Sequence, residues 1–126
     1  MISDFVFNSH PKFDKEMEKF FKKCPSMKND FERFKIALCV SIKNNDYNVP
    51  IDNKKFFKIE GLSKKVYLPA FVVKMFYCEK MNRGSNSGFR ITFVYDKSKK
   101  AIYFSEIYFK GNKDVEDKER INKMFK

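Results

Sequence analysis

The feature that most constrains the fold of this chain is a change in the spacing of its apolar residues near Phe56. Before Phe56, apolar residues recur every three or four positions over 13–24 and again over 31–42, as in amphipathic helices. After it they alternate with polar residues, most clearly over 89–95, as in half-buried strands. We therefore expect one α+β domain over residues 1–126, with its helices early and most of its sheet late in the chain.

Capping residues predict where the two early helices begin and end. The first is capped by Ser9 or His10, carries Pro11 in its first turn, where a missing N–H costs little, and ends at Pro25. The second runs from about residue 29 to 45. Because only a short turn separates them, we expect an antiparallel helical hairpin.

Strand-like stretches lie at 3–8, 56–59, 66–81, 89–95 and 101–110. The last three are joined by short turns and predict an antiparallel meander. With 3–8 they predict a mostly antiparallel four-stranded sheet, in which the short stretch 56–59 is not counted. A C-terminal helix completes the order β-α-α-β-β-β-α, and the helical hairpin is expected to pack on one face of the sheet.

The positive charge of the chain is unevenly distributed. The net charge is +11, and residues 51–113 hold 14 basic against 5 acidic side chains. Such a segment attracts polyanions, so we expect nucleic acid as a partner. The alternative is a lysine-rich composition with a solvated surface, which would spread the charge evenly.

Several kinds of chemistry find no support in the sequence. His10 is the single histidine, so a two-histidine mechanism is excluded, and no acidic or histidine cluster has metal-ligand spacing. Cys24, Cys39 and Cys78 form neither a disulfide framework nor a zinc motif. Residues 1–10 do not resemble a signal peptide, and no apolar run is long enough to cross a membrane. We expect a cytoplasmic protein with reduced thiols and neither cofactor nor metal.

Alternation predicts where the basic residues of the meander lie. If the apolar residues of 89–95 face the helices, Arg90 points to the opposite face of the sheet. On the last strand, Glu106, Tyr108 and Lys110 share one face. Because the helices are expected to cover the other face, we expect this one to be open. An open surface of cations and an aromatic ring suits RNA phosphates and bases.

Other basic residues lie near this expected face. Lys74 lies on the predicted strand 66–81. The two faces of that strand are similarly apolar, so alternation alone does not assign Lys74 to either face. The expected RNA contacts outside the strands are Arg83, Lys80 and Lys113. Taken singly, each is better explained as a solvated cation, and the expectation of RNA binding depends on several of them lying together. The alternative role of Glu106 is that of a salt-bridge partner of Arg90.

Three segments of the second half resemble a known family. Residues 87–95 (SGFRITFVY) resemble the glycine–aromatic–arginine strand of the RelE/ParE superfamily of toxin–antitoxin toxins, and residues 106–111 (EIYFKG) look like its final strand. Residues 116–121 look like the terminal helix of a RelE-like subgroup. The resemblance implies a type II toxin that is silenced by a cognate antitoxin and, if RelE-like, cleaves mRNA on the ribosome.

The resemblance implies roles for particular residues. Arg90 matches the strand arginine that contacts the scissile phosphate, and Lys110 matches the basic residue that closes the last strand. Lys74 lies on the strand that carries the family's catalytic basic residues. The family's C-terminal catalytic tyrosine has no counterpart after Lys113, and Tyr108 is the nearest substitute.

The expected reaction is a metal-independent attack of the RNA 2′-OH on the neighbouring phosphate. Arg90 would stabilise the charged transition state, and acid–base work would fall to Lys74, Lys110, Glu106 or Tyr108. Two other functions stay open: a ParE-like toxin that acts on DNA gyrase and cleaves no RNA, and a decayed, non-catalytic module that binds RNA or antitoxin.

Overall fold

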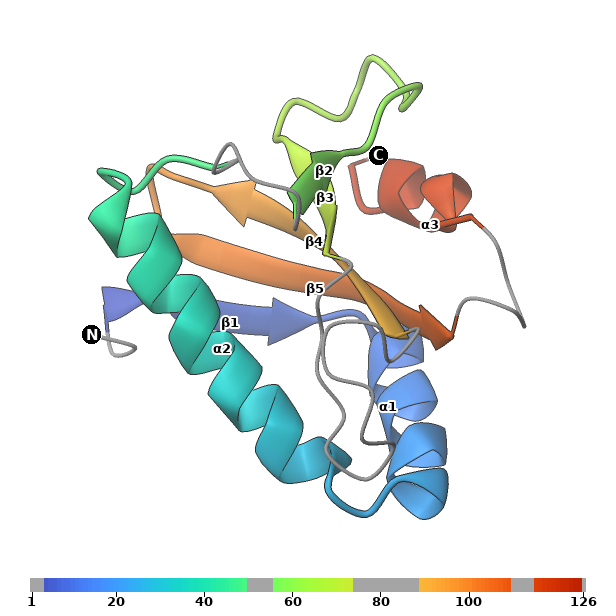
Figure 1. Cartoon of the computed structure of the whole chain (residues 1–126). Helices are drawn as coiled ribbons and strands as arrows, with labels where there is room; N and C mark the ends of the chain where they lie inside the picture. The colour runs from blue at the N-terminus through green and yellow to red at the C-terminus, as the bar shows by residue number, and fades with distance from the viewer. Residues whose placement is uncertain (1–3, 50–55, 74–88, 110–114, 126) are drawn as a thin grey trace.

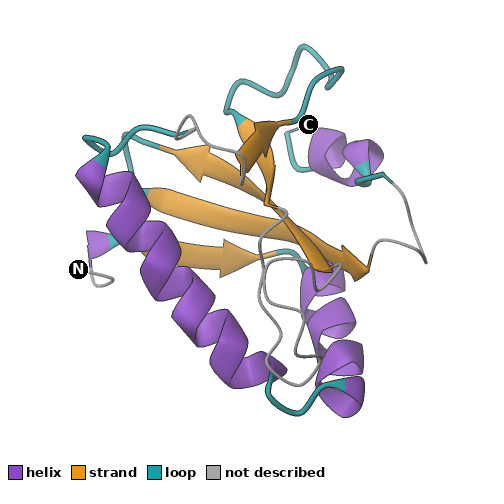
Figure 2. Cartoon of the chain, in the orientation of Figure 1, coloured by secondary structure: helices purple, strands orange, loops and turns teal. Residues whose placement is uncertain are grey.

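The computed structural model describes residues 4–49, 56–73, 89–109 and 115–125. Figure 1 shows their arrangement and Figure 2 their secondary structure. The elements are β1 (Val6–Ser9), α1 (Pro11–Lys23), α2 (Met27–Asn44), β2 (Phe56–Lys58), β3 (Ala70–Val73), β4 (Phe89–Asp96), β5 (Ala101–Phe109) and α3 (Lys118–Lys123). The α+β class expected from the sequence is confirmed.

The sheet differs in detail from the predicted one. It has five strands in the order β1-β5-β4-β3-β2. β1 pairs with β5 in parallel, whereas β2, β3, β4 and β5 pair antiparallel in succession. The prediction of four strands is wrong because the short stretch at Phe56 does pair, through Phe56–Lys58, with Val73–Phe71 of β3.

The expected helix ends are confirmed for α1 and corrected for α2. His10 caps α1, and its imidazole Nδ1 accepts a hydrogen bond of 3.0 Å from the backbone N–H of Lys12. α2 begins at Met27, two residues before the predicted start. Ser26 precedes it without capping a backbone N–H through its side chain, and its hydroxyl instead donates a hydrogen bond of 2.8 Å to the carboxylate of Asp30. The two helices meet at this turn and diverge across the sheet in Figure 1.

The main core lies between the sheet and the helices α1 and α2. It includes the alternating residues Phe89, Ile91, Phe93 and Tyr95, as the sequence predicts. Phe104 of β5 is at its centre. The ring of Phe104 stacks on Phe13 of α1 at 5.4 Å between centroids and meets Phe31 of α2 edge-on at 5.1 Å.

The opposite face of the sheet is not uncovered along its length, which corrects the prediction. A second apolar cluster joins Val72 and Val94 of the sheet to Ile121 of α3 and Ile59 of the segment after β2. Ile121 and Val94 are fully buried there. α3 therefore covers the part of this face around Val72 and Val94, which is the same face that carries Arg90.

The strand expected at 66–81 begins later than predicted. Residues 66–69 are not in a strand, and β3 starts at Ala70. Pro69 has no N–H to donate to the neighbouring strand. Its carbonyl accepts a hydrogen bond of 3.0 Å from the backbone N–H of Tyr95. Residues 74–81 of the predicted strand lie outside the described residues.

The cysteines also differ from the expectation of three reduced thiols. Cys24 is disulfide-bonded, whereas Cys39 is a free thiol in the core. Burial raises the pKa of the Cys39 thiol to about 11, so it stays protonated.

In the part of the chain that the structure describes, no helix is both long and apolar enough to cross a membrane.

Candidate functional site

Three of the eight residues predicted for the site fall within the described part of the chain. They are Arg90 on β4 and Glu106 and Tyr108 on β5. The other five lie outside the described residues: Lys74, Lys80, Arg83, Lys110 and Lys113. The geometry below therefore concerns the β4–β5 part of the predicted site.

Arg90 and Tyr108 are direct neighbours across the β4–β5 ladder. The residues on either side of Arg90 belong to the main core, so its side chain lies on the face away from α1 and α2. Arg90 is half-buried, and its Nη1 donates a hydrogen bond of 3.2 Å to the carbonyl of Phe89. The predicted face for Arg90 and Tyr108 agrees with this arrangement.

A β-bulge shapes the next part of this face. The register shifts between Thr92 and Phe93, so that Ser105 is an extra residue on β5. Its hydroxyl is hydrogen-bonded to that of Thr92, and Glu106 beside it bonds the backbone N–H of Asp117 at 2.7 Å. The bulge thus places two consecutive polar side chains, Ser105 and Glu106, on the side of Arg90.

Glu106 and Tyr108 are both buried on this face. Glu106 is 2% exposed and Tyr108 is 7% exposed. Burial raises the pKa of the Tyr108 phenol to about 12, helped by the charges of Glu116 and Glu106 and opposed by Arg90. At neutral pH Tyr108 is therefore a proton donor and not a base, and it offers little ring surface for a base to stack on.

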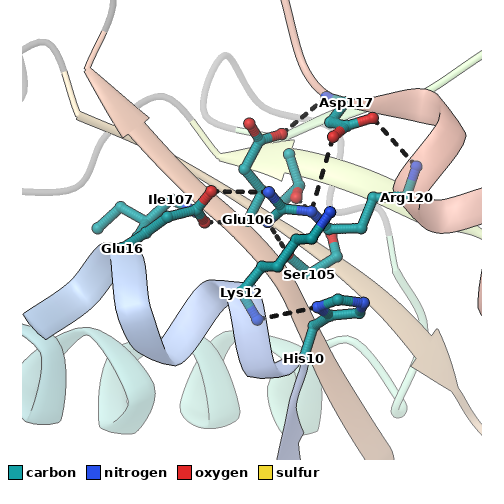
Figure 3. A network of polar contacts seen from close by, with 9 residues as sticks. His10, Lys12, Glu16, Ser105, Glu106, Ile107, Asp117 and Arg120 are labelled. Atoms are coloured by element: carbon teal, nitrogen blue, oxygen red, sulfur yellow. Dashed lines mark hydrogen bonds and ion pairs between the residues drawn. The ribbon is translucent and has the colours of Figure 1, made fainter.

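A network of polar contacts holds α3 against this face (Figure 3). Arg120 of α3 binds Glu16 of α1 through two hydrogen bonds, of 2.9 and 2.7 Å, and donates a third, of 2.6 Å, to the carbonyl of Ser105. Glu16 also accepts a bond of 3.2 Å from the backbone N–H of Ile107. The Glu16 interaction raises the pKa of Arg120 further, so the guanidinium stays charged.

Asp117 links this network to Glu106. Its carboxylate caps α3 by accepting from the N–H of Arg120 at 3.0 Å, and it lies 3.7 Å from the Arg120 Nε. Its own N–H is the group that Glu106 accepts from. Glu106 is therefore part of the attachment of α3, which is a structural role that the sequence did not reveal.

The sequence carries a signal for only part of this network. Asp117 precedes Arg120 by three residues at the start of a helix, as capping residues do. No local pattern marks Glu16, because it lies 104 positions from Arg120. The pairing depends on the tertiary fold.

His10 lies at the edge of the network (Figure 3). Burial lowers its pKa, and the nearby charges of Arg120 and Lys12 lower it further. At neutral pH the imidazole is uncharged and its Nδ1 is engaged in capping α1. Within the described ranges, no group of three or more His, Cys, Asp or Glu side chains is placed to hold a metal ion.

Comparisons with protein families, with curated proteins and with solved structures found no match to this chain. The residues and their geometry are therefore the basis for assigning a function.

Proposed function

We propose that this protein is a type II toxin of RelE-like character, an endoribonuclease that cleaves mRNA on the ribosome. The observation that supports this most is the cross-strand pairing of Arg90 with Tyr108, with Glu106 two residues further along the same face. These are the described residues that the resemblance and the alternation pattern single out. A net charge of +11 provides the attraction for RNA.

In this proposal Arg90 is the electrostatic clamp on the scissile phosphate. Guanidinium groups bind phosphate oxygens through two parallel N–H donors and stay charged at any working pH. Tyr108, with its pKa of about 12, would serve as a neutral hydrogen-bond donor to the developing charge. The attack forms a bond from the 2′ oxygen to phosphorus and breaks the bond from phosphorus to the 5′ oxygen. The base that removes the 2′ proton and the acid that protonates the leaving 5′ oxygen would come from Lys74 and Lys110, as predicted from the sequence.

Cleavage in a translation reaction tests the proposal. Purified protein added to a reconstituted reaction should produce discrete cuts within mRNA codons, and Arg90→Ala should remove them. Intact mRNA in a reaction that is translating would count against the proposal.

The burial of Glu106 and Tyr108 favours a second candidate, a protein that binds without cleaving. Both side chains are almost inaccessible, and Glu106 is already bonded to Asp117. A ParE-like toxin that acts on DNA gyrase and a non-catalytic module are the two forms of this candidate. Inhibition of gyrase in a supercoiling assay, with intact mRNA in the translation assay, would favour the ParE-like form.

The proposed partners are a cognate antitoxin, mRNA and the ribosome, and the proposed location is the cytoplasm. The disulfide of Cys24 counts against that location, because cytoplasmic thiols are kept reduced. A cytoplasmic toxin must therefore be active without this bond. We expect Cys24→Ser to cleave mRNA as the natural protein does, and loss of cleavage would argue for an oxidising compartment.

A further inference from the structure

Two adjoining hollows lie at the end of the sheet away from Arg90. One, of about 450 Å³, is bounded by the turn after α2, the residues before β3 and the β4–β5 turn. The other, of about 310 Å³, is bounded by the residues before β3, the β4–β5 turn and the end of the chain after α3. Tyr67, Leu68 and Asp96 line both hollows, so these three residues form the wall between them.

Tyr67 is unusual among the aromatic residues of the described chain. Its side chain is 80% exposed, although an aromatic ring gains from burial. The ring is nevertheless supported, because Phe125 meets it edge-on at 5.4 Å between centroids. An exposed ring that is held in place is suited to stacking against a flat ligand.

Lysines line the hollows beside this ring. Lys97 lines the larger hollow, where its Nζ donates to the side-chain oxygen of Asn48 at 2.6 Å, and Lys99 lines the smaller one. The acidic residue of the wall, Asp96, is bonded within its own turn by Ser98 and by the N–H of Lys99. Its charge is therefore partly compensated, and the hollows present cations to a ligand.

We propose that these hollows bind a segment of single-stranded RNA, with one base stacked on Tyr67 and the flanking phosphates on Lys97 and Lys99. The segments 58–69 and 96–100 together hold six lysines and two acidic residues. This excess of positive charge favours a polyanionic ligand over a protein partner whose surface has no acidic patch. A flat base joined to a phosphate matches a ring flanked by ammonium groups.

This site is separate from Arg90. Arg90 and Asp96 are six positions apart on β4, which corresponds to about 20 Å along the strand. The inference rests on the proposed function only in taking RNA as the ligand. It adds a place where substrate is held without being cleaved.

Binding of a fluorescein-labelled, unstructured single-stranded RNA of ten nucleotides, measured by anisotropy on the full chain, tests the site. Tyr67→Ala should weaken binding roughly 5- to 150-fold, the range for losing one base–aromatic stack. Tyr67→Phe keeps the ring and should bind as the natural protein does. Because Tyr67 is exposed, both variants should keep the melting temperature.

The two lysines are tested by the salt dependence of binding. Lys97→Gln with Lys99→Gln should reduce the slope of log K against log salt by about 1.4, because two phosphate contacts to a single strand are lost. Lys22→Gln with Lys23→Gln, an equal charge change at the end of α1, should leave the slope unchanged.

Unchanged RNA affinity in Tyr67→Ala would overturn the proposal and leave a protein partner as the explanation of the exposed ring. An equal effect of both lysine pairs would also overturn it, since the attraction would then be diffuse. If the protein cleaves no mRNA but Tyr67→Ala weakens RNA binding, the endoribonuclease proposal fails and this site stands. If Arg90→Ala abolishes cleavage while Tyr67→Ala leaves RNA binding unchanged, the endoribonuclease proposal stands and this binding site fails.

Discussion

Replacing Arg120 by methionine removes the charged group that links α3 to Glu16 of α1 and to the carbonyl of Ser105 on β5. The Arg120 side chain is 8% exposed and its partner Glu16 is 27% exposed. Breaking a fully buried ion pair costs about 3–5 kcal/mol, and an exposed pair contributes about 0–1 kcal/mol. Because Glu16 is partly exposed and recovers water, we expect Arg120→Met to lower the free energy of unfolding by about 2–4 kcal/mol.

A double-mutant cycle with Glu16→Gln isolates the interaction itself. We expect a coupling energy of about 1–2 kcal/mol, since the amide oxygen of glutamine still accepts a hydrogen bond. Urea denaturation followed by far-UV circular dichroism measures it, and Arg120→Met alone should move the midpoint by about 1.5 M. The matched control is the exposed pair of Asp4 and Lys43, whose charged atoms lie 3.6 Å apart.

The cycle has a clear refuting result. If the coupling between Glu16 and Arg120 is no larger than that between Asp4 and Lys43, the network of Figure 3 does not hold α3 in place. The burial of Glu106 would then need another explanation.

Two further predictions concern His10 and Cys24. Folding lowers the pKa of His10 below its value in the unfolded chain, which is about 6.5. Between these two pKa values the unfolded chain therefore binds more protons than the folded protein. The free energy of unfolding should fall as the pH drops from about 6.5 through the folded-state pKa. His10→Asn keeps a cap acceptor without titrating, so its urea midpoint should fall less between pH 7 and 5, and an equal fall in both proteins would contradict this. Reduction of the Cys24 disulfide should lower the free energy of unfolding by about 2–4 kcal/mol, as judged from urea midpoints with and without reductant. Cys24→Ser should be insensitive to reductant, and an unchanged midpoint in the natural protein would refute the expectation.

The parts of the fold that could be predicted are those set by neighbouring residues. His10 and Pro11 define the start of α1, and the alternation over 89–95 assigns Arg90 to the face opposite the main core. The parallel pairing of β1 with β5 was missed, because it joins residues almost a hundred positions apart. A short strand at 56–59 was predicted, but its pairing with β3 as a fifth strand of the sheet was missed.

The candidate site was predicted in position but not in environment. Alternation places Glu106 and Tyr108 on the side of Arg90, whereas the bond of Glu106 to Asp117 depends on the position of α3 and on a bulge at Ser105 that no local pattern marks. The sequence did not single out Tyr67, because it lies in the stretch 66–81 that was predicted as a strand. The strand begins only after Pro69, so Tyr67 lies in a segment without strand pairing, where its side chain is exposed.

The central claim is that Arg90 acts on the RNA phosphate, and the rate of mRNA cleavage in a reconstituted translation reaction tests it most directly. We predict that Arg90→Ala slows cleavage by about 100-fold or more, the usual loss for one transition-state donor, and that Arg90→Lys retains part of the rate. Arg33→Ala, which removes the same charge from the exposed side of α2, should cleave at the natural rate. Equal rates for Arg90→Ala and the natural protein, or equal losses in the Arg90 and Arg33 variants, would contradict the account.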